Sequence, residues 1–101
     1  MKLIIVTAVE AFEEEVLTLF KKANIDSFSG FDIEGYKNIA PIVKASNWFS
    51  GKSKGNESIM FFSFTDAEKI DPLFNLITEF NNNLETDNPI RGIVLPIEKF
   101  I

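Results

Sequence analysis

The chain of 101 residues contains no cysteine and no histidine. Without cysteine it forms no disulfide and no zinc–thiolate site, and it has no thiol nucleophile. Without histidine it lacks the most common general base and metal ligand of proteins. The only sulfur atoms belong to Met1 and Met60, too few for a soft copper(I) site in one chain. We therefore expect a protein that is not an enzyme and that carries no cofactor and no metal.

Long hydrophobic runs are also missing. No apolar stretch approaches the roughly 20 residues that span a bilayer, and the apolar segment 3–6 is too short for a signal peptide. Fifteen acidic against ten basic residues give a net charge of −5, which argues against general binding to nucleic acid or anionic membranes. We expect a cytoplasmic protein without direct membrane insertion, built as a single domain over residues 1–101.

Phenylalanine is abundant, with 11 copies, and the spacing of apolar residues outlines six elements. Continuous or alternating apolar runs with β-branched residues predict strands. Apolar residues spaced by three and four positions predict helices. The predicted strands cover 2–9, 27–36, 57–65 and 90–97, and the predicted helices cover 11–23 and 71–80.

Local signals refine the ends of these elements. Glutamates at 13–15 begin the first helix and lysines at 21–22 end it, which complements the helix dipole and explains the acidic cluster better than a metal site does. Asp71 and Pro72 predict the N-cap and the first residue of the second helix. The alternation of the second strand is imperfect near Gly30, which predicts one irregular step there.

The element order is strand, helix, strand, strand, helix, strand. With right-handed crossovers this order predicts an α+β, ferredoxin-like βαββαβ sandwich, in which one four-stranded antiparallel sheet carries two helices on one face. The other face then has no cover from this chain. Because monomers rarely leave large apolar patches exposed, the Phe-rich strands predict that the protein forms an oligomer.

The connection 37–55 between the second and third strands is long for a hairpin. It contains four lysines and no acid, so it carries +4, and the rest of a chain of net charge −5 carries −9. It also holds the only tryptophan, Trp48, beside Phe49, followed by Lys52 and Lys54. Two interpretations stay open: a site for an anion or a partner, or an extended hairpin arm whose aromatic residues pack on a neighbouring subunit.

The chain resembles the PII-like superfamily, the trimeric ferredoxin-like proteins that include nitrogen regulatory PII and the CutA proteins. Residues 1–36 resemble PII without gaps, from Met1-Lys2 and an apolar strand to a strand that ends in Glu34-Gly35-Tyr36 before a long loop. The last strand, 93–98, resembles the apolar-Pro-apolar-Glu strand of PII. This resemblance implies the ferredoxin-like fold and a trimer.

In PII the long loop, the T-loop, reaches out to partner proteins, and a Gly-aromatic-Gly turn at its base touches ATP or ADP between subunits. Here that turn is Gly35-Tyr36-Lys37, and Arg91 stands where PII has a phosphate-contacting lysine. The resemblance therefore implies Gly35, Tyr36, Lys37 and Arg91 as ligand-binding residues. Residues 86–90 replace a Gly-rich stretch of PII and contain no glycine, which argues against a phosphate cradle of backbone N–H groups.

The middle of the chain is similar to CutA instead. Residues 47–52 correspond to the Tyr-Trp-Trp-x-Gly-Lys hairpin of CutA, 65–71 to its Thr-x-x-Glu-Lys-Leu-Asp stretch, and 95–97 to its Leu-Pro-Ile strand. This similarity implies an alternative function, a CutA-like divalent-cation tolerance protein with a rigid hairpin arm. Because histidine and cysteine are absent, metal binding would then use carboxylates.

The function that we predict is a non-enzymatic PII-like signalling protein, a homotrimer that senses a small ligand in the cleft between subunits. The resemblance implies an adenine nucleotide as this ligand and a membrane transporter or an enzyme as the regulated partner, with a metal-efflux pump as one such transporter. Trp48, Phe49, Lys52 and Lys54 would form the arm that faces the partner or the neighbouring subunit. A mobile segment 37–55 favours the PII-like function, and a fixed hairpin favours the CutA-like one.

Overall fold

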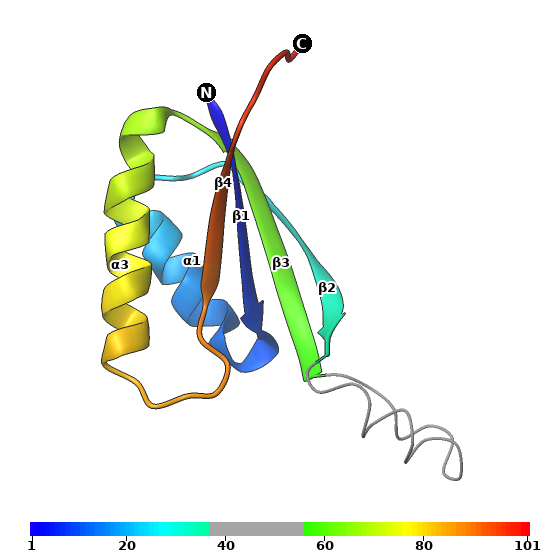
Figure 1. The fold of residues 1–101 in the computed structure, drawn as a ribbon, viewed down its shortest axis with the longest axis vertical. Coiled ribbons are helices and arrows are strands. Elements are labelled where there is room, and N and C mark those ends of the chain that lie inside the picture. The colour runs from blue at the N-terminus through cyan, green and yellow to red at the C-terminus, as the bar shows by residue number, and fades with distance from the viewer. Residues whose placement is uncertain (37–55) are drawn as a thin grey trace, which may run out of the picture.

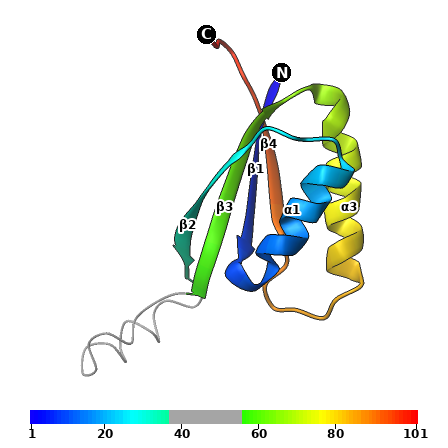
Figure 2. The same cartoon turned by 180° about the vertical axis from the view of Figure 1, so that it is seen from behind.

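The computed structural model describes residues 1–36 and 56–101. One sheet of four antiparallel strands carries both α-helices on the same face (Figures 1 and 2). This is the predicted α+β, ferredoxin-like arrangement. In chain order the elements are β1 (Lys2–Val9), the 3-10 turn η1 (Glu10–Phe12), α1 (Glu13–Lys22), β2 (Ser29–Gly35), β3 (Asn56–Thr65), the 3-10 turn η2 (Ala67–Lys69), α3 (Ile70–Asn82) and β4 (Arg91–Pro96).

The strand order in the sheet is β2-β3-β1-β4, so β1 and β3 are central and β2 and β4 lie at the edges. The register pairs Val6 with Phe61 of β3 and with Gly92 of β4. A Cβ atom on Gly92 would lie 3.3 Å from both Ile77 and Phe74 of α3, so the absence of a side chain lets β4 pack closely under that helix.

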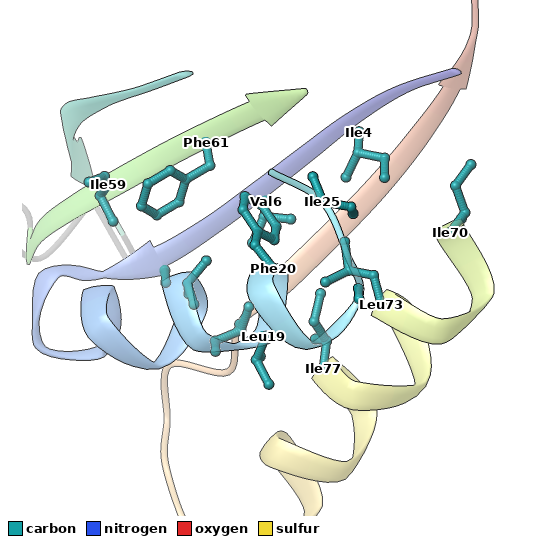
Figure 3. Close-up of a cluster of buried hydrophobic side chains, with 14 residues drawn as sticks. Ile4, Val6, Leu19, Phe20, Ile25, Ile59, Phe61, Ile70, Leu73 and Ile77 are labelled. Carbon is teal, nitrogen blue, oxygen red and sulfur yellow. The ribbon is translucent and has the colours of Figure 1, made fainter. Parts of the chain in front are cut away.

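The core lies between the sheet and the two helices (Figure 3). Phe20 of α1 is 1% exposed and packs edge-to-face on Phe28 and Phe61, with ring centroids 4.7 and 5.7 Å away. Such pairs add to the free energy gained by burying the rings. The buried apolar residues are Ile4, Val6, Ala8, Val16, Leu19, Phe20, Ala23, Ile25, Ile59, Phe61, Ile70, Leu73, Ile77 and Ile90.

The sheet face opposite the helices has no cover from the residues that the structure describes (Figure 1). On this open face Phe64 is 58% exposed and Ile93 is 51% exposed, although both are large and apolar. Within residues 1–36 and 56–101 the structure agrees with the sequence prediction of one uncovered sheet face. By register, the apolar side chains of the open face are those of Leu3, Ile5, Val9, Phe31, Ile33, Met60, Phe62, Phe64, Ile93 and Leu95.

Two local predictions are wrong. The helix α3 begins at Ile70 with Lys69 as N-cap, directly after η2, and not at the predicted cap, Asp71. Pro72 fits inside the first turn because backbone N–H groups there need no intrahelical acceptor. The irregular step near Gly30 is also absent, since β2 pairs with β3 without a break. A Cβ atom at Gly30 would lie 2.7 Å from the Phe61 ring, so the glycine makes room for that ring.

The two helices follow from the sequence pattern. The glutamates at 13–15 lie in the first turn of α1, and Lys21 and Lys22 lie in its last turn, as predicted. Each helix turns its apolar stripe to the sheet, with Val16, Leu19 and Phe20 buried in α1 and with Ile70, Leu73 and Ile77 buried in α3. Within the described residues, neither helix combines the length and the apolar character that a bilayer crossing requires.

Candidate functional site

A hollow of about 300 Å³ lies at one end of the sheet, where β1 and β2 end and β3 and β4 begin. We call it the Arg91 pocket. The register brings its polar residues together, because Thr7 of β1 pairs with Arg91 of β4, and Val9 and Ile33 pair with Ser58 from its two sides. The residues that line the pocket are Thr7, Ala8, Val9, Ile33, Gly35, Tyr36, Ser58, Asn88, Pro89 and Arg91.

The Arg91 pocket is continuous with the open face. Thr7 and Arg91 occupy the same side of the sheet as Ile5 and Ile93, two residues away along β1 and β4. Along this face the side chains change from apolar to polar as β1 runs from Leu3 toward Thr7. A second molecule that covered the apolar part of the face would therefore also lie against the mouth of the pocket.

The chain between α3 and β4 is fixed by side-chain hydrogen bonds. The Asn81 amide donates from Nδ2 to the Ile90 carbonyl, and the Ile90 N–H donates to Asn81 Oδ1, both at 2.9 Å. The Asn88 N–H donates to Thr86 Oγ1, also at 2.9 Å. Because Ile90 is 2% exposed and immediately precedes Arg91, this clamp determines where Arg91 enters the sheet.

The chemistry of the pocket suits an anion with an apolar body. Arg91 is the one cationic residue among the described residues that line it, and a guanidinium binds a carboxylate or phosphate through two parallel hydrogen bonds. Thr7, Ser58 and Asn88 add side chains capable of donating hydrogen bonds. Apolar side chains, among them Val9, Ile33 and Pro89, form the remaining wall.

A second hollow of about 490 Å³, the acidic hollow, shares Ile33 and Ser58 with the Arg91 pocket. Its carboxylates belong to the opposite face of the same sheet end, because Glu34 and Glu57 pair across the strands in the alternate register. Like charges placed directly opposite each other destabilise a sheet. The acidic hollow is lined by Glu10, Asp32, Ile33, Glu34, Glu57 and Ser58.

Two hydrogen bonds relieve part of this repulsion. The Tyr36 hydroxyl donates to Glu34 Oε2 at 2.5 Å. The Glu57 side chain shares a hydrogen bond with Glu10, and this bond, together with repulsion by the Glu57 charge, raises the pKa of Glu10 above its ordinary value of 4.5. A carboxyl pair of this kind holds one proton more readily than two separate carboxylates do.

The structure brings together three of the four ligand-binding residues that the resemblance implies. Gly35, Tyr36 and Arg91 all line the Arg91 pocket. Lys37 lies outside the described residues. The other predicted residues outside the described part of the chain are those of the arm, Trp48, Phe49, Lys52 and Lys54.

Sequence reasoning missed Thr7, Ser58 and Asn88 in the pocket and Asn81 behind it. These polar residues come from four separate parts of the chain, and only the strand register and the fold bring them together. Ser58 lies inside β3, and no local pattern in the sequence distinguishes it as a pocket residue. Among the residues that the structure describes, no group of three or more Asp or Glu side chains is placed to hold a metal ion.

The sequence matches no protein-family model and no curated protein. Solved structures do match its fold. CPII, a nitrogen regulatory PII-like protein from Thiomonas intermedia K12, has a TM-score of 0.62 at 14% identity, over 99% of this chain and 94% of that chain. A protein from Thermus thermophilus assigned to PII-like signalling has a TM-score of 0.62 at 11% identity, over 93% of this chain and 83% of that chain.

The chain has the PII-like fold. The resemblance that the sequence suggested is therefore confirmed at the level of the fold. The CPII structure in the first comparison holds ADP, AMP and bicarbonate. A second CPII structure, with ADP and bicarbonate, has a TM-score of 0.60 at 15% identity, over 93% of this chain and 86% of that chain.

Proposed function

We propose that this chain is a non-enzymatic PII-like signalling protein, a cytoplasmic homotrimer that binds a small anionic ligand in the Arg91 pocket. The ligand is an adenine nucleotide or an anion of similar chemistry. Binding changes the interaction of the protein with a regulated partner, a membrane transporter or an enzyme, and a metal-efflux pump is one transporter of this kind. Trp48, Phe49, Lys52 and Lys54, with Lys37 at the pocket, form the arm that reaches this partner.

The observation that carries the proposal is the continuity of the open face with the Arg91 pocket. Exposed apolar side chains such as Phe64 and Ile93 require a partner surface, because soluble monomers rarely leave such a face in water. The simplest partner is another copy of the chain, and three copies can close into a symmetric ring. A copy seated there adds a second wall to the pocket, so assembly and ligand binding are coupled.

The comparisons support the ligand class. CPII, which shares the fold, was solved with ADP, AMP and bicarbonate, all of which are anions. In the present chain Arg91 provides the cation that such ligands need, and Ile33, Val9 and Pro89 provide an apolar surface. With neither histidine nor cysteine in the chain, regulation by binding is a simpler function than catalysis.

The first experiment measures the oligomeric state. Light scattering during size-exclusion chromatography should give the mass of three chains for the wild type. Ile93→Glu places a charge on the open face and should give monomers. Leu84→Glu is the matched control, because Leu84 is also partly exposed (41%) but follows α3, away from the sheet. A wild-type monomer at all concentrations would refute the trimer.

The second experiment measures ligand binding by thermal shift with AMP, ADP, ATP, cyclic AMP, bicarbonate and divalent cations. A ligand that binds only the native state adds about 2.7 kcal/mol at a hundred times its dissociation constant, which gives a visible shift. Arg91→Ala should abolish the shift, and Lys21→Ala, which removes an equal charge from α1, should preserve it. Unchanged binding in Arg91→Ala would contradict the assigned role of Arg91.

The CutA-like alternative makes opposite predictions. A protein of that kind would shift with divalent cations alone, and amides across 37–55 would exchange slowly with solvent. The PII-like function predicts a shift with anions and rapid exchange across 37–55 in the free protein. These two readouts separate the functions without any assumption about the structure of that segment.

A further inference from the structure

The three consecutive residues 88–90, of which the first two line the Arg91 pocket, have no backbone N–H group to offer a ligand. The Asn88 N–H donates to Thr86 Oγ1. Pro89 has no N–H, because its nitrogen is part of the ring. The Ile90 N–H donates to Asn81 Oδ1. The chain that enters the pocket before Arg91 therefore presents carbonyl groups and side chains but no main-chain donors.

Chains of phosphates are normally bound by several main-chain N–H groups at once. Gly-rich turns and helix N-termini provide such groups, because they point successive amides at the same anion. Among the described residues of this pocket the cation is Arg91, whose planar guanidinium matches one carboxylate or one phosphate group. The Tyr36 hydroxyl already donates to Glu34, so its proton is engaged as well. For the second and third phosphates of a nucleotide, described residues 88–90 therefore offer no main-chain N–H group, and only side-chain donors such as Thr7 and Ser58 remain there.

The carboxylates of the acidic hollow also disfavour ligands that carry several negative charges. Glu34 and Glu57 line the acidic hollow, which shares Ile33 and Ser58 with the Arg91 pocket. Because the two hollows share these wall residues, the carboxylates adjoin the Arg91 pocket, and salt screens charges mainly beyond about 8 Å at physiological ionic strength. Each further negative charge on a ligand is therefore repelled by these carboxylates, and among the described lining residues only Arg91 provides a compensating charge.

We propose that the Arg91 pocket selects anions with a single charged group, such as a carboxylate, bicarbonate or a monophosphate, over nucleoside di- and triphosphates. This inference rests on the proposed function, which places the ligand in this pocket, and it specifies the class of that ligand. Selectivity arises from Asn81, Thr86 and Pro89, which leave residues 88–90 without donors, and from the carboxylates of the acidic hollow.

The test is isothermal titration of the wild-type protein, without divalent cations, against AMP, ADP, ATP, inorganic phosphate and bicarbonate. AMP should bind at least about tenfold more tightly than ADP and ATP. Phosphate or bicarbonate binding alone would show that the charged group suffices, and AMP binding alone would show that the nucleoside contributes. ADP or ATP binding as tightly as AMP would overturn the inference and leave the proposed function standing. Binding of none would refute both.

A gain-of-function variant tests the cause of the selectivity. Thr86→Val removes the acceptor and frees the Asn88 N–H, and Pro89→Gly restores a donor at position 89. In the double variant the ratio of ADP to AMP affinity should rise by about threefold or more. Thr78→Val on an exposed part of α3 is the control for the loss of a hydroxyl. A folded double variant with the wild-type ratio would overturn the assigned cause, and if the variant does not fold the wild-type titration still decides.

Discussion

The two faces of the sheet have similar side chains and opposite surroundings. On the covered face Ile4 and Phe61 are 0% and 4% exposed, whereas on the open face Phe64 and Ile93 are 58% and 51% exposed. An apolar strand face is normally buried, so the difference shows that residues 1–36 and 56–101 complete only one of the two apolar layers. Under the proposed function, the open face and the Arg91 pocket at its end would be completed by another copy of the chain.

The largest effect is expected on the covered face. Phe61→Ala removes a ring that packs on Phe20 and Phe28, each 5.7 Å away between centroids. The free energy of unfolding should fall by about 3–5 kcal/mol, the usual cost of deleting a buried aromatic ring. Urea denaturation measures this loss, which should not depend on protein concentration. A loss below about 1 kcal/mol would show that Phe61 is not part of a packed core.

The same substitution on the open face should act differently. Phe64→Ala lies on the same strand, β3, but it should weaken association between chains, by about tenfold or more in the dissociation constant. The unfolding temperature of the wild type should rise with protein concentration, and that of Phe64→Ala should rise less. A loss of stability that is large and independent of concentration would mean that Phe64 packs within its own chain.

Asn81 tests the connection that joins α3 to the rim of the Arg91 pocket. Asn81→Leu keeps a similar volume but leaves the N–H and the carbonyl of buried Ile90 without their partners. We expect a loss of about 1–3 kcal/mol in the free energy of unfolding and faster hydrogen exchange at Ile90. Asn82→Leu, on the exposed side of the same helix turn, is the control and should leave that amide protected.

The smallest effect concerns pH and the acidic hollow. The pKa of Glu10 is raised by its hydrogen bond to Glu57 and by the charge of Glu57, so the folded state holds this proton more tightly than the unfolded state does. The resulting stabilisation is fully present below the unfolded pKa of 4.5 and is lost as pH rises through the higher folded value. Glu57→Gln removes the repelling charge. The free energy of unfolding should then decrease less as pH rises, and it should be higher at neutral pH than in the wild type. Urea denaturation from pH 4 to 7 measures the free energy of unfolding at each pH, and Glu98→Gln is the control. If this free energy changes equally with pH in both variants, Glu57 is not the cause of the raised Glu10 pKa.

Periodicity in the sequence was sufficient to predict the fold, because each element has a strong apolar pattern. The bounds of β1 were predicted to the residue. The start of α3 was missed because Asp71 and Pro72 are as compatible with the first turn as with the cap. Gly30 suggested an irregular strand, but its role is to admit the ring of Phe61, a contact between different strands that spacing does not reveal.

The candidate site was less predictable than the fold. Gly35, Tyr36 and Arg91 were found through the resemblance, since nothing in their local pattern distinguishes them from ordinary surface residues. Ser58 and Asn81 were not found, because their positions follow from strand register and from a side chain that bonds to the backbone nine residues away. Such partners are fixed by tertiary structure and carry no signature in a single sequence.

The edge strand β4 has a consequence for how far the protein can assemble. An unpaired strand edge invites further strands and thereby open-ended fibres. Here β4 has six residues and ends at Pro96, which has no N–H to offer a further strand. The exposed apolar surface lies on a sheet face, whereas the β4 edge is short and ends at a proline. We therefore expect the proposed assembly to close through the sheet face and not to extend as a filament from β4.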